Sequence, residues 1–241
     1  MTATFRADAT PILAVRNERE RTFQYLCALV AWAGTKRVGR IVFVENSDTR
    51  FDFSQVVRYL EEAGKEVELM IFDGNKDAEV FGKGYGEGVI MEHMCRNSRL
   101  LRATPAFYKI TGRLFVQNFD AVSEATAAPD AFRLRPAKGG RAPKAVTSFF
   151  KCSRELFEAR LLDAYRRVTD EEGDRIEQAY FHRLSDLDVP DFGVKPLLVG
   201  QSASTGKVYH SYDDDVVRVA RSFLPPVAAD EQPDPRDLTR R

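Results

Sequence analysis

Cysteines are scarce in this chain and form no recognisable pattern. The 241 residues include three, Cys27, Cys95 and Cys152, which lie far apart and make no CxxC pair. Isolated cysteines in odd number argue against a disulfide framework and against a zinc site, and they are typical of reduced thiols inside the cell. We therefore expect a cytoplasmic protein.

Long apolar runs are missing as well. The first eight residues lack both the basic block and the apolar block of a secretion signal. The longest apolar stretch, around Tyr25 to Ala33, is well short of the ~20 residues that span a bilayer. No transmembrane segment is expected. Peripheral contact with a membrane is compatible with this sequence.

Neither charge is in excess. Lysine plus arginine and aspartate plus glutamate both number 36, so the formal net charge is zero and nothing suggests general binding to nucleic acid. With 44% hydrophobic and 30% charged residues, the chain has the profile of a soluble globular protein with a sizeable core. We expect a single domain over residues 1–225 and a disordered tail over residues 226–241.

Strand-like and helix-like segments alternate through the first half of the chain. Short apolar runs precede stretches in which apolar residues recur at helical spacing. This alternation predicts an α/β fold with a Rossmann-type, mostly parallel sheet and helices on both faces. The predicted strands are Pro11–Val15, Arg40–Val44, Glu66–Phe72, Ala106–Ile110 and Arg113–Val116, and the predicted helices are Phe23–Ala33, Phe53–Ala63 and Gly88–Leu101.

The second half of the chain is less regular. Residues 123–143 are rich in Ala, Pro, Gly and basic side chains, which predicts a mobile loop or a join between two halves. Beyond this segment the pattern predicts two further strands and three further helices. The strands are Ala145–Phe150 and Pro196–Val199, and the helices are Ser153–Val168, with Ser153 as N-cap, Ile176–Leu184 and Val216–Leu224.

Polar residues follow three of the predicted strands. They are Arg16-Asn17-Glu18, Glu45-Asn46-Ser47 and Asp73-Gly74-Asn75. Parallel sheets bind ligands at the carboxyl ends of their strands. The three clusters are therefore expected to share one crevice.

A glycine-rich stretch runs from Phe81 to Met94 and includes Lys83, Gly84 and Glu87. It is not a Walker loop, which needs Ser or Thr after its lysine, and it is not a dinucleotide fingerprint, which directly follows the first strand. P-loop ATPases and nicotinamide dehydrogenases are therefore not supported, and no organic cofactor is expected. The stretch is either a plain surface loop or a flexible backbone that approaches a ligand, with Lys83 meeting an anion.

The segment Lys109-Ile-Thr-Gly-Arg113 places two cations, a hydroxyl and a glycine between apolar strands. A buried strand does not normally hold two cations without anionic partners. A diphosphate would be such a partner, with Arg113 making a forked contact and Lys109 acting as a point charge. The alternative is an exposed hairpin whose charges lie in water.

The order of these signals resembles the GT-A glycosyltransferases, and in particular the bacterial enzymes of capsule and surface-polysaccharide clusters. The resemblance covers about residues 10–210. It implies a nucleotide-sugar half over about 10–122 and an acceptor half over about 144–225. The segments that carry it are the first strand with its polar loop, Phe43–Ser47, Lys83–Glu87 ahead of a helix, and Lys109–Arg113 followed by Asn118–Asp120.

The resemblance implies transfer of a sugar from a nucleotide sugar to a glycan or lipid-linked acceptor. The loop Ser202–Gly206 would offer hydroxyls and amides to a phosphate or sugar, unless it is an ordinary turn. The implied donor-binding residues are Arg16, Asn17, Glu45, Asn46, Ser47, Lys83, Gly84, Glu87, Lys109, Thr111, Gly112, Arg113, Ser204 and Gly206.

Metal binding is a further implication of the resemblance. Many members of that family hold a divalent metal, Mn²⁺ or Mg²⁺, with an Asp-x-Asp pair after the diphosphate strand, whereas this chain has Asn118-Phe119-Asp120. Asp120 is then the one carboxylate of this segment that could hold the metal. His210, further along the chain, is a second candidate ligand. Alternatively, Lys109 and Arg113 stabilise the leaving diphosphate without a metal.

An inverting transferase also needs a carboxylate that takes the proton of the acceptor hydroxyl. Glu177 is the first candidate and Asp174 the second, because the family often carries an acidic pair at the start of a helix at this point. The alternative is that these side chains only stabilise the first turn of the helix.

Two other functions are compatible with the same motifs and their order along the chain. A sugar-phosphate nucleotidyltransferase on a related fold would activate the sugar rather than transfer it, but no loop rich in glycine and arginine follows the first predicted strand. A non-catalytic module that binds a sugar or a nucleotide is the other alternative.

Overall fold

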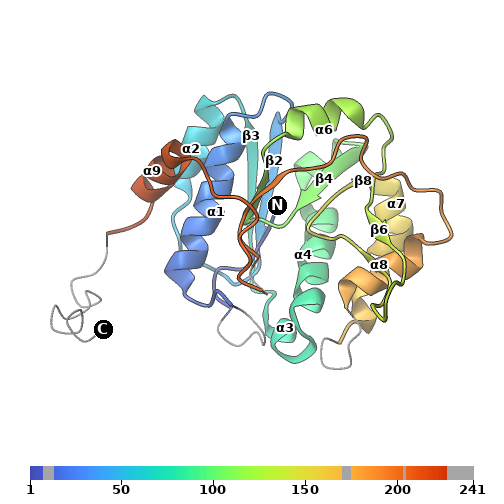
Figure 1. Ribbon diagram of the computed structural model, residues 1–241. Coiled ribbons are helices and arrows are strands. Elements are labelled where there is room, and N and C mark those ends of the chain that lie inside the picture. The colour runs from blue at the N-terminus through green and yellow to red at the C-terminus, as the bar shows by residue number, and fades with distance from the viewer. Residues whose placement is uncertain (8–13, 170–174, 203–204, 227–241) are drawn as a thin grey trace.

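A parallel sheet of three strands forms the centre of the molecule. The computed structural model describes residues 1–7, 14–169, 175–202 and 205–226 (Figure 1). The strands lie in the order β1 (Thr2–Ala3), β2 (Arg40–Glu45) and β3 (Glu66–Ile71). Thr2 is opposite Val44, and Arg40 is opposite Glu66. The prediction of an α/β fold is confirmed.

The remaining strands form antiparallel pairs. They are β4 (Ala106–Ile110) with β8 (Phe149–Ser153), β5 (Leu114–Val116) with β9 (Leu198–Gly200), and β6 (Leu134–Arg135) with β7 (Lys144–Ala145). A parallel bridge between Thr2 and Thr111 joins the end of β4 to β1. The sheet system is therefore parallel in the first half of the chain and antiparallel in the second.

Helices cover both faces of the parallel strands, as predicted. On one face α1 (Glu18–Ala33), α2 (Ser54–Glu62) and α9 (Asp214–Ser222) pack around Ile41 and Phe43 of β2. On the other face α4 (Lys83–Asn97) and α8 (Ile176–Leu184) form a core with Val42 and Val44 of β2. Figure 1 shows the two groups on opposite sides of β2. Alternate residues of one strand thus belong to different cores, because side chains of a strand point alternately to its two faces.

Shorter helical segments connect these elements. Ser153 is the N-cap of α7, as predicted, since its Oγ accepts a hydrogen bond from the Leu156 amide at 3.2 Å. The single helix expected over 153–168 is instead three pieces, two of which are not α-helical. The connecting elements are α3 (Lys76–Phe81), α5 (Arg99–Arg102), α6 (Phe119–Ala125), α7 (Arg154–Leu156), the π-helical turn Phe157–Leu161 and the 3₁₀ turn Ala164–Arg167. No described helix is long and apolar enough to cross a membrane.

The first strand differs from the prediction. It is β1 at residues 2–3, and the predicted strand Pro11–Val15 lies largely outside the described residues, with Ala14 and Val15 in no strand. The correction has a physical basis, because Ala3 and Phe5 are buried and the Phe5 amide donates to the buried carboxylate of Glu45 at 2.9 Å. A strand of two residues shows no alternation that a sequence pattern could reveal.

The glycine-rich stretch is helical, which corrects the expectation of a loop. Helix α4 begins at Lys83 rather than at Gly88. Gly84 and Gly88 lie one turn apart, and a Cβ atom on Gly88 would lie 2.1 Å from the Cβ of Tyr165. A Cβ atom on Gly84 would lie 3.2 Å from the amide nitrogen of Ile176. The glycines therefore allow α4 to lie close to the segment that leads into α8.

Residues 123–143 are partly packed into the fold, whereas residues 135–142 are exposed, and the predicted mobile loop or join between two halves stays a prediction. The helix α6 extends to Ala125, and Ala131 and Phe132 are fully buried. The Ala131 amide donates to the carbonyl of Lys151 at 2.9 Å, which attaches this segment to β8. Two buried residues among many polar ones were not evident from composition. The predicted tail lies outside the described residues from position 227 onward.

Replacing Gly88 by Ala should destabilise the fold. The new Cβ would overlap Tyr165, and overpacking of this kind costs about 1–3 kcal/mol even though alanine favours a helix over glycine by ~1 kcal/mol. Urea unfolding measures the change. The matched control is Gly39→Ala, because no heavy atom lies within 4 Å of a Cβ at Gly39. Equal stability of the two variants would contradict the packing role of Gly88.

Candidate functional site

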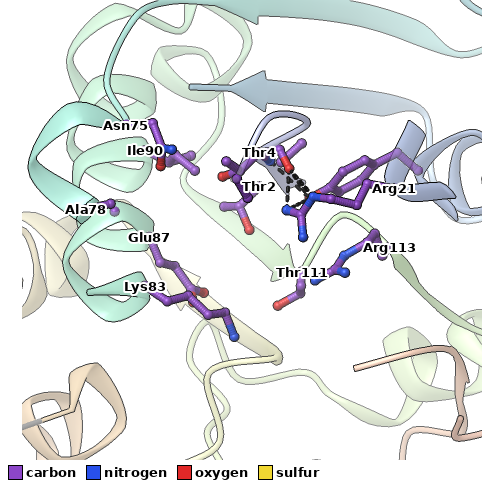
Figure 2. Close-up of a pocket in the computed structure, with 14 residues that line it drawn as sticks. Thr2, Thr4, Arg21, Asn75, Ala78, Lys83, Glu87, Ile90, Thr111 and Arg113 are labelled. Carbon is purple, nitrogen blue, oxygen red and sulfur yellow. Dashed lines mark hydrogen bonds between the residues drawn. The ribbon is translucent and has the colours of Figure 1, made fainter. Parts of the chain in front are cut away.

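A recess opens where the parallel strands end. It is a cavity of about 50 Å³, room for a few water molecules or one small anion. Figure 2 shows side chains reaching it from α1, α4, the residues around β1 and the turn after β4. We call this cavity the recess. The residues that line it are Thr2, Ala3, Thr4, Ala7, Arg21, Tyr25, Asn75, Ala78, Lys83, Gly86, Glu87, Ile90, Thr111 and Arg113.

The turn Thr111-Gly112-Arg113 is held against β1. The Gly112 amide donates to the carbonyl oxygen of Thr2 at 2.8 Å. A Cβ atom on Gly112 would lie 2.6 Å from that same oxygen, so only glycine allows this approach. Gly112 therefore supports the site through the backbone, while Thr111 and Arg113 line the recess.

Arg113 is a buried guanidinium with an unused donor. It is 2% exposed, its charge lies over the ring of Tyr25 at 5.6 Å, and its Nη1 donates weakly to Gln24 at 3.4 Å. Its Nε has no hydrogen-bond partner. Burial lowers the pKa of Arg113 below its usual range. Among the described residues no carboxylate lies within ion-pair distance of Arg113, so its charge is compensated mainly by the aromatic face of Tyr25.

Gln24 connects Arg113 to the turn after β9. Its Oε1 accepts from Arg113, and its Nε2 donates to Oε1 of Gln201 at 2.8 Å. Gln201 in turn donates through Nε2 to the carbonyl oxygen of Gly206 at 2.8 Å. Gly206 has a φ of 67° and lies in a tight turn, so its observed role is structural. Ser204 lies outside the described residues.

Lys109 lies directly behind the recess and is 2% exposed. Its ammonium forms an ion pair with Glu87 and donates to the Thr147 carbonyl at 2.7 Å. Burial lowers the pKa of Lys109, and the charge of Lys83 acts in the same sense, whereas Glu177 raises it. The pairing with Glu87 also favours the charged form. The predicted exposed hairpin is therefore excluded for Lys109.

Lys83 and Glu87 reach the recess from neighbouring turns of α4. In Figure 2 the Lys83 side chain extends from the helix toward Thr111, and Glu87 lies one turn further along. Glu177, in the first turn of α8, is half-buried and close enough to Lys109 to affect its pKa. The structure thus gathers Lys83, Glu87 and Glu177 with Lys109. Asp174 lies outside the described residues.

Arg21 is a residue of the recess that the sequence did not reveal. It is 3% exposed, and its guanidinium donates to the carbonyl oxygens of Thr4, Phe5 and Val15. It therefore holds the chain on both sides of the undescribed residues 8–13 against α1. Arg21 ends a charged run ahead of the predicted helix Phe23–Ala33, so nothing in the sequence distinguished it from the exposed charges beside it.

Glu45, Asn46 and Ser47 do not line the recess, which corrects their prediction as nucleotide-binding residues. Glu45 is 0% exposed, and its carboxylate accepts hydrogen bonds from the amides of Phe5, Ser47 and Thr49 and from the Ser47 hydroxyl. Asn46 accepts from the Thr4 hydroxyl at 2.6 Å. These side chains organise the backbone beneath the recess.

Arg16 and Asn17 lie at the start of α1. The Asn17 side chain accepts a hydrogen bond from the Glu20 amide at 2.9 Å and is the N-cap of the helix. Arg16 is exposed beside it. Neither residue lines the recess.

The candidate metal ligands are separated from the recess. The Asp120 carboxylate accepts from the backbone amides of Lys36 and Arg37 at 3.2 and 2.8 Å, near the start of β2 and hence at the other end of the sheet. His210 is exposed, and its carbonyl accepts from the Gly200 amide at 2.9 Å. Within the described ranges no cluster of three or more His, Cys, Asp or Glu side chains is placed to hold a metal.

Replacing each of the two buried arginines by methionine should have different effects on the free energy of unfolding. Arg21→Met removes the side-chain donor of the Phe5 and Val15 carbonyl oxygens and leaves the Thr4 carbonyl with only the Tyr25 hydroxyl, so it should lower the free energy of unfolding by about 2–4 kcal/mol. Arg113→Met removes a charge without a carboxylate partner, so stability should stay level or rise by up to about 2 kcal/mol. Urea unfolding of both variants tests this. An equal loss in both would show that Arg113 is a structural residue.

Comparison with known proteins identifies no family. No protein-family model and no curated protein matches the chain. Among solved structures, one similar chain is described as a glucose-1-phosphate thymidylyltransferase from Bacillus anthracis in complex with sucrose. The two share 10% sequence identity at a TM-score of 0.45, over 93% of this chain and 96% of that chain. A likeness this distant assigns neither a family nor an activity.

Proposed function

We propose that this chain is a glycosyltransferase that moves a sugar from a nucleotide-sugar donor to a glycan or lipid-linked acceptor in surface-polysaccharide assembly. The observation that carries the proposal is the buried guanidinium of Arg113, whose Nε has no partner, in a recess that also receives Lys83. A buried cation that lacks both a carboxylate and a full set of hydrogen-bond acceptors is destabilising. An anionic ligand would compensate it.

The donor diphosphate is the anion assigned to the recess. Arg113 offers forked donors, Lys83 a mobile ammonium and Thr111 a hydroxyl, all lining the same cavity. Lys109 adds positive potential from behind while Glu87 holds it in place. Because the recess admits one small anion, one phosphoryl group of the diphosphate would enter it, and the other phosphoryl group, the sugar and the base would remain outside.

The leaving group would be stabilised by these cations. In the transfer, the acceptor oxygen forms a bond to the anomeric carbon while the bond from that carbon to the diphosphate oxygen breaks. The nucleoside diphosphate leaves with the electron pair, and positioned cations stabilise the charge that develops on it. The described residues do not form a set of metal ligands around the recess, so no step is assigned to a metal.

Glu177 is the proposed general base. It lies in the first turn of α8, half-buried, within electrostatic range of Lys109. A carboxylate in this position would take the proton of the acceptor hydroxyl as the new bond forms, if the enzyme inverts the sugar. Glu87, which is already paired with Lys109, would keep its structural role.

Nucleoside diphosphates should stabilise the native protein but not the Arg113→Met variant. At a hundredfold excess over Kd, a ligand of the native state raises Tm by about 5–10 °C. Thermal-shift measurements with UDP, GDP and TDP, and with the monophosphate CMP, each with and without manganese, would show the effect and its dependence on base and metal. Equal shifts in both proteins would remove Arg113 from the anion site.

The same panel separates the possible activities once nucleotide sugars are supplied. Slow release of nucleoside diphosphate from a nucleotide sugar supports a glycosyltransferase. Release of pyrophosphate from a nucleoside triphosphate and a sugar phosphate would instead indicate a nucleotidyltransferase. Stabilisation without any release would indicate a binding module.

Replacing Glu177 by Gln should abolish turnover while leaving donor binding unchanged. Loss of a general base lowers kcat by about 10²-fold or more, whereas the diphosphate contacts do not involve this side chain. The matched control is Glu155→Gln, an exposed carboxylate in the first turn of α7, which should keep full activity. Unchanged turnover in the Glu177 variant would place the base elsewhere.

A further inference from the structure

The outer edge of β3 is unpaired within the described part of the chain. β3 is an edge strand of the parallel sheet and lies on the side of β2 away from β4 (Figure 1). The Glu66 amide donates to the carbonyl oxygen of Gly39 at 2.8 Å, and the Phe72 amide donates to that of Glu45 at 3.0 Å. Alternate residues of a strand direct their backbone groups to opposite edges, so every second residue of β3 bonds to β2. The residues whose amide and carbonyl groups point away from β2 are Val67, Leu69 and Ile71.

The side chains of the same three residues form an apolar row on the face of the sheet that α2 covers. Val67 packs against the core on that face, whereas Leu69 and Ile71 are 36% and 38% exposed. A strand edge with free backbone groups and apolar side chains is a template for pairing with another chain. Proteins usually protect such an edge with proline or lysine, and β3 contains neither.

The two glutamates of β3 do not protect this edge either. The Glu68 carboxylate accepts hydrogen bonds from the Ser98 hydroxyl at 2.6 Å and from the amides of Arg99 and Leu100 at 2.8 and 2.9 Å. Glu66 forms an ion pair with Arg99 at 2.9 Å. Both negative charges are therefore engaged with α5 on the other face of the sheet, and a second strand would meet little repulsion from them.

The sequence of β3 is complementary to itself in one antiparallel register. When Leu69 is opposite Leu69 of a second copy, Val67 is opposite Ile71, so each outward amide meets an outward carbonyl and the apolar rows lie side by side. A shift of two residues in one direction places Glu68 opposite Glu68 of the other copy. The same shift in the other direction places Val67 opposite Asp73, outside the strand. Only the register centred on Leu69 pairs all the outward groups without opposing like charges.

We propose that β3 is the contact of a symmetric homodimer, in which two copies pair their β3 strands antiparallel about a two-fold axis at Leu69 and so join their sheets. A contact of this kind is isologous, because each copy offers the same surface to the other. No residue of β3 lines the recess, so both recesses stay open. The contact is independent of the proposed transferase activity.

Sedimentation equilibrium of the native chain and two variants tests the dimer. The native protein should have twice the mass of one chain. Leu69→Lys should be a monomer, because it places two ammonium groups opposite each other at the axis. The matched control is Val80→Lys, which also replaces an exposed apolar side chain, 67% exposed in α3, and should stay dimeric. Circular dichroism should show the same secondary structure in all three proteins.

A native protein that is monomeric from micromolar to millimolar concentrations would overturn the dimer. A Leu69→Lys variant that stays dimeric would overturn the contact at β3. Loss of the dimer in both lysine variants would also overturn it, since Val80 lies outside the strand.

Cysteine variants test the register without adding charge. Opposite residues in a hydrogen-bonded antiparallel pair have Cα atoms about 5.5 Å apart, a separation that a disulfide spans. Leu69→Cys should therefore form a disulfide-linked dimer under mild oxidation. Val67→Cys should not, because its copies lie on opposite sides of the axis. The native cysteines Cys27, Cys95 and Cys152 are buried and serve as the unreactive background. Crosslinking through Val67→Cys but not through Leu69→Cys would overturn the register.

Discussion

The placement of residues 2–5 is the constraint on which the rest of the site depends. Three elements hold this short segment. Arg21 of α1 donates to the carbonyl oxygens of Thr4 and Phe5, the buried carboxylate of Glu45 accepts from the Phe5 amide, and the Gly112 amide donates to the Thr2 carbonyl. Because these partners come from α1, β2 and the turn after β4, the segment unites the two halves of the sheet and forms the floor of the recess.

The distribution of charge follows from this arrangement. The chain as a whole is neutral, but the wall of the recess combines Arg21, Lys83 and Arg113, with Lys109 behind it. Arg21 uses its donors on backbone oxygens, whereas Arg113 keeps its Nε without a partner. The two arginines are equally buried and chemically identical, and only their partners distinguish a structural cation from one available to a ligand. Overall charge therefore says little about what a single cavity binds.

Sequence reasoning predicted the α/β fold, and the resemblance to the glycosyltransferases grouped Lys83, Glu87, Thr111 and Arg113, which all line the recess. The expectation that polar residues at strand ends share one crevice failed at Glu45, since only the fold reveals that its side chain turns inward to three backbone amides. The glycines of α4 were taken for a loop because their helical role comes from the close approach of Tyr165, which is distant in sequence. The division into a donor half and an acceptor half stays a prediction.

The hydrogen bonds of Gln24 have a fixed polarity. A guanidinium can only donate, so the oxygen of the Gln24 amide must face Arg113 and its nitrogen must face Gln201. The same logic fixes Gln201, whose nitrogen then meets the Gly206 carbonyl oxygen. The two amides therefore form a chain of hydrogen bonds with one donor-to-acceptor direction, which begins at Arg113 and ends in the turn after β9. If Arg113 reoriented toward an anion, the Gln24 oxygen would lose its donor, and the turn around Gln201 and Gly206 would respond to an occupied recess without contacting the anion.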